Sequence, residues 1–216
     1  FSRSNIRPIN IPSNVKIIGE NSFSFCRFLR GARFTKDSKL EIIEKEAFYH
    51  SYIKEDLKLP ANLTRICERS FAFCEHFDKI ETSKDSKLEI IEKEAFYHTN
   101  IKEFIIPASL TQICESSFAY CLHIDKIEPP KDSKLKIIEK DAFNNSSIKS
   151  FTIPASLEKL DENWYHNAPS LTDIKVDPNS LIFKKYEDKL ILTKSNFDQE
   201  DFDVIFSALP KIVKVK

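Results

Sequence analysis

Cysteine and histidine are the residues of this chain whose spacing comes nearest to that of a metal site. Cys74 and His76 form a Cys-x-His pair, and Cys121 and His123 form another, 47 residues further along. Zn²⁺ binds thiolate and imidazole, but a structural zinc site needs four ligands that converge on one point. Each pair is a copy of the other, so we expect a feature of a repeat and predict no metal.

The five cysteines fall into two columns, one of Cys26, Cys74 and Cys121 and the other of Cys67 and Cys114. Within a column they recur every second repeat unit, ~10 Å apart by strand spacing. A disulfide needs Cα atoms within ~7 Å. We therefore expect buried, unpaired thiols that pack as small apolar residues. Bridges from Cys67 to Cys74 or from Cys114 to Cys121 stay open as the alternative.

Acid–base or nucleophilic catalysis has weaker candidates. The carboxylate pairs Glu44/Glu46 and Glu92/Glu94 are copied with the repeat, as are His50 and His98, so we expect a solvated face. The phosphate-binding, zinc-protease and serine-hydrolase motifs are absent from the sequence. In the non-repeated region 177–205, Tyr186 and Asp188 make no recognisable site. We predict no enzyme and no cofactor.

All these residues belong to an internal repeat. Residues 36–50 and 84–98 are the same fifteen letters, KDSKLEIIEKEAFYH, and an altered copy starts at Lys131. Each period of 47–48 residues holds two units of 23–24 residues. The first apolar position of each unit falls at Ile6, Leu29, Ile53, Phe77, Ile101, Ile124, Ile148 and Leu171. An inward aromatic position recurs at Phe23, Phe48, Phe71, Phe96, Phe118, Phe143 and Tyr165.

A period of 20–29 residues with this apolar pattern is typical of a leucine-rich-repeat solenoid, in which stacked units bury a shared core. The x-x-I-x-I segment alternates with period two, which predicts a short strand with residues such as Phe104 and Ile106 turned inward. We predict a curved right-handed stack of about eight units. A parallel β-sheet forms its concave face, with short turns, 3-10 or helical turns elsewhere. The chain has only 2 glycines, which predicts few turns with positive φ.

The repeat unit resembles the BspA-like (TpLRR) class of leucine-rich repeats, whose unit reads L-x-x-I-x-I-P-x-x-V-x-x-I-G-x-x-A-F-x-x-C. Residues 9–26, INIPSNVKIIGENSFSFC, fit it almost letter for letter, and the match covers about residues 6–176. The resemblance implies a cell-surface or secreted protein of a bacterium or a parasitic protist, linked to adhesion. This class has no shared catalytic site to carry over. One departure is that the glycine survives only at Gly19, which predicts looser turns in the other units.

The pattern divides the chain into three parts. Residues 1–176 form the repeat array, and residues 177–205 form a β-hairpin-like insertion with strands at 180–186 and 189–193 around a Glu-Asp turn. Residues 206–216 begin a further, truncated repeat, because Phe206, Ile212 and Val215 match the repeat again. With no Met and no signal-like apolar segment at the start, we expect a slice of a longer protein, with any targeting or anchoring segment outside it.

Charge and hydropathy limit the classes of partner. Lys+Arg and Asp+Glu are 33 each, for a formal net charge of +0, which gives no electrostatic reason to expect nucleic acid or an anionic membrane. No apolar run approaches the ~20 residues of a membrane-spanning helix, so we expect no direct membrane insertion by this segment. The expected partner is a protein or a glycan of unknown identity.

Outward positions of the predicted strands form the candidate binding face. Its residues alternate in sign between neighbouring strands, so a solvated ladder of ion pairs is at least as well supported as a ligand site. A second column, Ile17, Ile42, Ile90 and Ile137, faces partly outward and either packs under the K-D-S-K turns or forms a weak apolar stripe. The candidate concave face consists of Arg33, Lys58, Lys79, Glu81, Glu103, Ile105, Lys126, Glu128, Thr152 and Lys175.

Two functions follow from these observations. The first is an adhesion or protein-binding module of a microbial surface or secreted antigen, which contacts host cells, matrix or other microbes. The alternative is an intracellular leucine-rich-repeat scaffold, which unpaired cysteines fit. Asn62, Asn144 and Asn145 begin N-x-S/T sequons, which a eukaryotic secretory route would make available for glycans.

Overall fold

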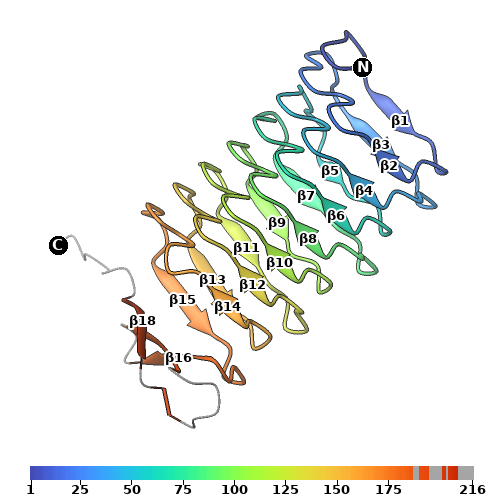
Figure 1. The fold of residues 1–216 in the computed structure, drawn as a ribbon. Coiled ribbons are helices and arrows are strands. Elements are labelled where there is room, and N and C mark those ends of the chain that lie inside the picture. The colour runs from blue at the N-terminus through green and yellow to red at the C-terminus, as the bar shows by residue number, and fades with distance from the viewer. Residues whose placement is uncertain (187–189, 195–200, 203, 209–216) are drawn as a thin grey trace.

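The chain folds into an elongated β-solenoid whose coils stack along one axis (Figure 1). The computed structural model describes residues 1–186, 190–194, 201–202 and 204–208. Within these ranges there is no helix, so the turns are not the 3-10 or helical turns that the sequence left open. The predicted solenoid with parallel strands is confirmed.

The strand of the x-x-I-x-I segment occurs eight times, once in each predicted unit. Neighbours pair in parallel in three groups, β1-β3, β5-β7-β9-β11 and β13-β15. As predicted, Phe104 and Ile106 are buried, each 1% exposed. The strands are β1 (Ile9–Ile11), β3 (Ala32–Phe34), β5 (Leu57–Lys58), β7 (Lys79–Glu81), β9 (Glu103–Ile105), β11 (Lys126–Glu128), β13 (Ser150–Ile153) and β15 (Asp173–Val176).

A second parallel sheet of seven strands lies on the other wall of the solenoid and was not predicted. Each of its strands has only two residues, too few for an alternating pattern to be visible in the sequence. In each strand the second residue is buried in the core. The strands are β2 (Ile17–Ile18), β4 (Ile42–Ile43), β6 (Arg65–Ile66), β8 (Ile90–Ile91), β10 (Gln112–Ile113), β12 (Ile137–Ile138) and β14 (Lys159–Leu160).

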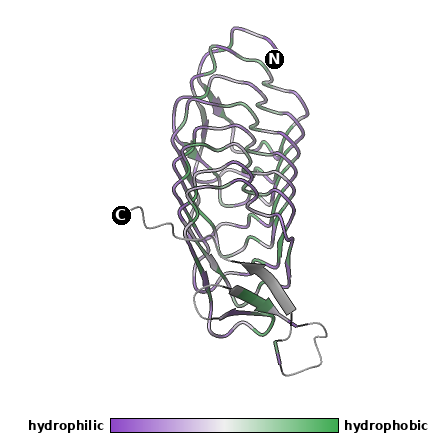
Figure 2. Cartoon of the chain, turned by 90° about the vertical axis from the view of Figure 1, so that its left-hand side faces the viewer, coloured by the Kyte–Doolittle hydropathy of each residue, from purple (hydrophilic) through white to green (hydrophobic). Residues whose placement is uncertain are grey.

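Successive coils lie nearly in register, so that hydrophobic and hydrophilic segments recur at matching places from coil to coil (Figure 2). The clearest column is a stack of rings in the core. Neighbouring rings have centroids 5.1–5.5 Å apart and planes within 5–14° of parallel, an arrangement that aromatic side chains favour when the rings are offset. The stack consists of Phe23, Phe48, Phe71, Phe96, Phe118 and Phe143.

The last coil departs from the predicted stack. Phe118 N–H donates to the carbonyl of Ala142, the residue before Phe143, and Phe143 N–H donates to that of Trp164, the residue before Tyr165. By backbone register, Tyr165 therefore occupies the position that Phe118 and Phe143 occupy in their coils. Nevertheless Trp164 is the fully buried ring, and it meets Phe143 edge-on at 5.8 Å. The prediction that Tyr165 continues the inward stack is wrong, because the larger indole fills the core from the neighbouring position.

The turns that carry the stacked rings have positive φ without glycine. Fourteen non-glycine residues among those described have φ between 52° and 60°, and neither Gly19 nor Gly31 does. The prediction of few such turns is therefore wrong. The reason lies in the hydrogen bonds: Ser116, Phe118 and Tyr120 donate N–H to the next coil, while the residues between them donate within their own turn. These bonds between coils offset the left-handed strain of ~1–2 kcal/mol per residue.

Glutamate side chains in every second coil form a further hydrogen bond between coils. A side-chain oxygen of Glu44, Glu92 or Glu139 accepts the N–H of Glu20, Glu68 or Glu115 in the preceding coil, at 2.9–3.0 Å. The sequence had predicted looser turns where glycine is replaced, and this is wrong at these glutamates because their carboxylates join adjacent coils. Cys67 and Cys114 take the same position in the intervening coils, so the bond follows the repeat of 47–48 residues up to the sixth coil. In the seventh coil Asp161 accepts the Lys140 N–H in the same way, at 2.9 Å.

All five cysteines are free, as predicted. Cys26, Cys74 and Cys121 are fully buried, and the Cys74 and Cys121 thiols donate to the carbonyls of Phe48 and Phe96 at 3.0 and 3.2 Å. Burial raises the pKa of Cys74 to about 11 and that of Cys121 to about 12. Burial likewise raises the pKa of Cys67 to about 11 and that of Cys114 to about 12, although both are only half-buried.

After β15 the parallel pattern gives way to an antiparallel sheet in the order β16 (Phe183–Tyr186), β17 (Leu190–Thr193) and β18 (Val204–Ala208). β18 contains Phe206 and runs across the boundary predicted at residue 205. The Glu-Asp turn at 187–188 and the positions of Ile212 and Val215 lie outside the described residues. The division into array, insertion and further repeat therefore stays a prediction.

The positive φ of the turns predicts that a glycine variant is more stable than an alanine variant there, the reverse of the usual order. Ser116 has φ 55°, so we expect Ser116→Gly to unfold at a higher denaturant concentration than Ser116→Ala, by about 1 kcal/mol in free energy. Thr111 is the control, because its φ is not positive, and there alanine should be the more stable by about 0.5–1 kcal/mol. The same order at both positions would contradict this account of the turns.

The raised thiol pKa values predict slow alkylation of the folded protein. Thiolate is the reactive form, and a raised pKa leaves less of it at pH 8. We expect iodoacetamide to leave Cys67, Cys74, Cys114 and Cys121 unmodified in the native protein, as read by mass spectrometry. The same treatment in denaturant without reductant should modify all five cysteines. Native modification of Cys67 at the rate of a free cysteine would show that the thiol is not shielded.

Candidate binding surfaces

We call the side of the solenoid built by the eight strands β1, β3, β5, β7, β9, β11, β13 and β15 the first wall. The predicted candidate face lies on its outer side, and the strand register brings the residues of that face together in two columns. Lys58 pairs with Glu81, and Thr152 with Lys175. In the neighbouring column Lys79 and Lys126 lie on either side of Glu103. Ile105, which pairs with Glu128, is 50% exposed and adds an apolar side chain, while Arg33 pairs with Asn10 in the first sheet.

The charges of this face neutralise one another. Lys79 Nζ lies 3.7 Å from Glu81 and 3.6 Å from Glu103, and Lys58 Nζ lies 3.5 Å from Glu81. Lys126 Nζ donates to Glu103 at 3.0 Å, and this bond lowers the pKa of the Glu103 carboxyl. Exposed pairs of this kind stabilise a protein by about 0.2–1 kcal/mol each. The face is thus a ladder of ion pairs, and its role in binding stays a prediction.

At the edge of this face, Arg33 is also paired. Its Nε donates to Glu55 at 2.8 Å, and the hydrogen bond lowers the pKa of the Glu55 carboxyl. Lys175 lies 3.3 Å from Asp173 on its own strand, and Glu128 accepts from the Ser150 hydroxyl at 2.9 Å.

The isoleucine column lies on the outer side of the second sheet. Ile17 is 50% exposed, and Ile42, Ile90 and Ile137 are half-buried, which confirms that they face partly outward. Arg65 and Gln112 stand between them in the register. The column is therefore interrupted by polar side chains rather than continuous.

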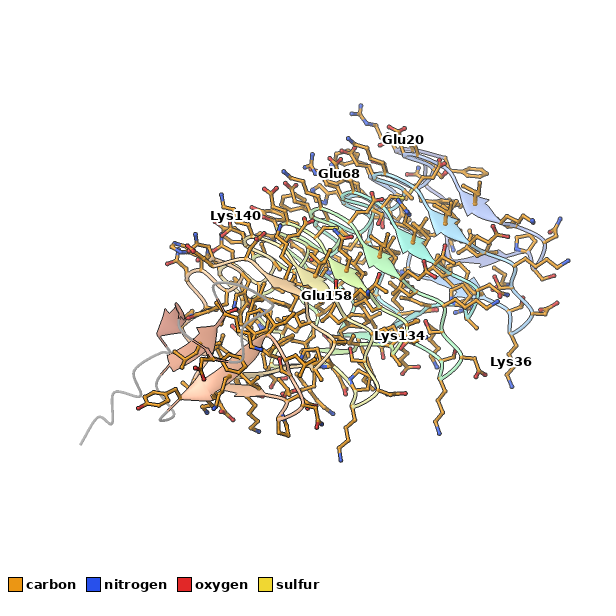
Figure 3. All side chains as sticks on the ribbon, turned by 60° about the horizontal axis from the view of Figure 1, so that its bottom comes forward. Glu20, Lys36, Glu68, Lys134, Lys140 and Glu158 are labelled. Carbon is orange, nitrogen blue, oxygen red and sulfur yellow. The ribbon has the colours of Figure 1, made fainter. Side chains whose placement is uncertain are left out.

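Another charged row runs along one edge of the solenoid. Figure 3 shows Glu20, Glu68 and Lys140 in line along this edge, with Lys36 and Lys134 toward the opposite one. Within the row, Lys45 lies 3.2 Å from Glu68, and Lys93 lies 3.1 Å from Glu115. This outer row consists of Glu20, Lys45, Glu68, Lys93, Glu115 and Lys140.

The residues that suggested catalysis or a metal do not converge. Cys74 is buried inside the wall while His76 is exposed outside it, and the same holds for Cys121 and His123. Among the described residues no group of three or more His, Cys, Asp or Glu could hold a metal ion. Arg69 lies between Glu46 and Glu94, at 3.4 and 3.3 Å, so these acids hold neighbouring coils together rather than facing solvent alone.

A surface that sequence reasoning missed lies along the turns beside the core stack. We call it the aromatic edge and define it as Phe25, Tyr49, His50, Phe73, Tyr97, His98 and Tyr120. Rings of adjacent coils contact one another with centroids 5.3–6.3 Å apart. All seven side chains are partly or fully exposed to solvent, so the edge presents aromatic surface to a ligand.

The backbone explains why these rings point outward. Phe25, Phe73 and Tyr120 occupy the second positive-φ position of their turns, two residues after the buried ring of the core stack. The signal was therefore present as the aromatic-x-aromatic spacing of Phe23 with Phe25 and of Phe71 with Phe73. It was missed because only the inward aromatic position was followed along the repeat.

The side chains of all three sequon asparagines are engaged by neighbouring residues. The Asn62 side chain donates to the Ser38 carbonyl of the preceding coil and accepts from Lys87 Nζ in the next, each at 2.9 Å. Asn145 donates to the Asn144 side chain at 2.7 Å. Whether any of them carries a glycan stays a prediction. No helix in the described ranges is long and apolar enough to span a membrane.

Known proteins share the repeat. No curated protein gives a significant match. Among solved structures, a leucine-rich cell surface protein of Faecalibacterium prausnitzii is 18% identical, with 80% of this chain and 60% of that one covered and a TM-score of 0.42. The pneumococcal vaccine antigen PcpA is 20% identical over 80% and 62% of the two chains, with a TM-score of 0.38. A leucine-rich repeat protein of Bacteroides ovatus is 23% identical over 81% and 55%, with a TM-score of 0.37.

The chain thus spans 55–62% of the length of these three proteins. The family assignment rests on the repeat itself. The model of the BspA type leucine-rich repeat region matches in six copies over residues 1–124 and 89–189. Those ranges cover most of the 216 residues, and the chain therefore belongs to the BspA-type leucine-rich repeat family.

Proposed function

We propose that this chain is a non-catalytic binding module of a microbial cell-surface or secreted protein, and that it serves adhesion to host cells, matrix or other microbes. Membership of a leucine-rich repeat family, a protein-interaction fold, supports the binding role. The observation that carries the proposal is the first wall, whose eight strands pair in parallel in three groups. Each coil adds the same exposed columns, so a ligand meets several coils at once.

The first wall is the proposed contact surface for a partner protein. Its ion pairs are exposed and individually weak, so exchanging them for pairs with a partner costs little. Alternating charges on a rigid wall steer association and fix the register of a partner more than they add affinity. An electrostatically complementary protein surface is the partner that such a wall suits.

The intracellular scaffold is the second candidate, and the free thiols are the observation that favours it. The structure weakens this support. Three of the cysteines are fully buried, and burial raises the thiol pKa values of Cys74 and Cys121. Shielded thiols of this kind resist oxidation in either compartment, so they do not distinguish the two candidates. Labelling of intact and permeabilised cells with an antibody would separate them.

Charge reversal of the wall tests the proposed function. We expect the triple variant Lys58→Glu, Lys79→Glu and Lys126→Glu to lose at least about tenfold in affinity for cultured epithelial cells or for purified matrix proteins. The measurement is binding of the purified, labelled chain over a range of concentrations.

The outer row supplies a control with the same change in net charge. The triple variant Lys45→Glu, Lys93→Glu and Lys140→Glu should bind as the unchanged chain does. Equal loss in both variants would indicate a response to total charge, and full binding by the wall variant would place the contact elsewhere. Absence of binding by the unchanged chain to any cell or matrix protein would contradict the adhesion role itself.

A further inference from the structure

We propose that the N-terminal part of the aromatic edge is a binding groove for an acidic oligosaccharide. The inference deepens the proposed function, on which it rests, by naming a ligand class and a place other than the charged wall. The groove lies across the first three coils, at the blue to cyan end of the solenoid (Figure 1).

The groove has a volume of about 410 Å³ and an aromatic lining. Phe25 and Phe73 belong to the aromatic edge, and Phe28, Tyr52 and His76 extend it by one residue in each of the first three coils. Phe28 is 54% exposed, and the rings of Tyr52 and His76 contact each other with centroids 3.8 Å apart. A second hollow of about 460 Å³ adjoins the first, since Phe25 and Arg27 line both.

The fold does not require these rings. In the sixth coil, Asn145 takes the position of Phe25 and Phe73, and it keeps both the positive φ of 52° and the hydrogen bond to the next coil, at 2.9 Å. In the same coil Ser147 takes the position of Tyr52. Asparagine tolerates positive φ well, whereas bulky aromatic residues there are rare and strained. Strain that the fold does not demand is a reason to infer a ligand.

Cations surround the aromatic lining. Arg3 lies over the Phe25 ring at 5.5 Å, and Lys54 Nζ lies over the Tyr52 ring at 5.1 Å. Arg27 is exposed beside the groove and forms no ion pair with the residues that the structure describes. The lining also contains one acid, Glu75, whose carboxylate lies 3.1 Å from His98 Nδ1 and forms an ion pair with it only when that imidazole is protonated.

The sequence around the groove is basic although the whole chain is neutral. Of the charged residues among the first 34, only Glu20 is acidic. Of the basic residues, Arg27 lines the groove and Arg3 lines the adjoining hollow, so these two make the groove complementary to a negatively charged ligand. The basic residues of this segment are Arg3, Arg7, Lys16, Arg27, Arg30 and Arg33.

An acidic sugar chain fits this combination. The C–H face of a sugar ring packs flat on an aromatic ring, and a guanidinium donates two hydrogen bonds to a carboxylate or a sulfate. Rings of the edge follow one another at 5.3 Å from Phe25 to His50 and at 6.0 Å from His50 to Phe73. This spacing is comparable to one sugar unit of an extended oligosaccharide.

An acidic peptide fits less well. Side chains on one face of an extended peptide recur every two residues, at roughly 6.6 Å, so they fall out of step with the rings. The observations therefore favour the sugar.

Calorimetric titration of the purified chain tests the ligand class. The probes are a heparin-derived hexasaccharide with sulfates, a hyaluronan hexasaccharide with carboxylates alone, neutral maltohexaose and a hexaglutamate peptide. We expect saturable binding of one or both acidic sugars, at least about tenfold tighter than that of maltohexaose or the peptide. Tighter binding of the sulfated probe identifies the anion as sulfate, and equal binding identifies a carboxylate as sufficient.

Single variants test the place. Tyr52→Ala and Arg27→Gln should each weaken binding of the acidic sugar by about tenfold. The matched controls are Leu122→Ala, which removes an exposed apolar side chain in the fifth coil, outside the groove, and Arg30→Gln, which has the same loss of charge as Arg27→Gln; both should bind normally. Thermal unfolding of each variant shows whether the fold is kept.

Three results would overturn the inference. If Arg30→Gln loses as much affinity for the acidic sugar as Arg27→Gln does, the sugar is attracted by the basic segment as a whole and not by the groove. Tighter binding of hexaglutamate than of the acidic sugars would assign the groove to a peptide. Lack of binding by either acidic sugar would refute the ligand class. If the unchanged chain then still binds cells or matrix proteins, the proposed function stands and only this inference fails.

Discussion

Hydrogen bonding between adjacent coils is the constraint on which the rest of this structure depends. A single coil of 23–24 residues cannot pair its own backbone groups, so strands and turns alike donate N–H groups to the next coil. Because the turns take part, pairs of residues four positions apart in the turns, such as Ser116 and Tyr120, adopt positive φ, and the coil keeps one shape from unit to unit. Side chains then fall into columns. The stacked phenylalanines, the buried thiols and the charged rows are all consequences of that single backbone arrangement.

The same arrangement explains the charge balance of the chain. Residues in one column face each other across neighbouring coils, so a column of like charges would repel itself while alternating charges attract. Lys58 with Glu81 and Lys45 with Glu68 follow this rule on two different surfaces. Glutamates that accept backbone N–H groups in every second coil impose a further alternation. Net neutrality therefore arises from pairing within the molecule, and the basic segment at the aromatic groove stands out against it.

Sequence reasoning reached the parts of the fold that rest on long or repeated patterns. The first-wall strands, inward residues such as Phe104 and the unpaired cysteines followed from periodicity and spacing. The second sheet could not be predicted, since strands of two residues show no periodicity in the sequence. The positive φ angles could not be predicted either, because hydrogen bonds between coils, which a single repeat unit does not show, hold Ser116 and Phe73 in this conformation without glycine. Trp164 displaced Tyr165 because ring size decided the packing. Of the candidate surfaces, the columns of the wall were predictable and the aromatic edge was overlooked.

Stacking in one dimension also has a mechanical consequence. Phe1 and β15 lie at opposite ends of the solenoid (Figure 1), so a pull between these ends loads all the junctions between coils in series, with the same force on each. Each coil touches only its neighbours, and the weakest junction sets the force at which the rod opens. The first wall is interrupted between β3 and β5 and between β11 and β13, whereas the second sheet runs unbroken past both places. The first wall therefore has fewer strand hydrogen bonds at these two junctions, and we expect the rod to bend there before its coils separate.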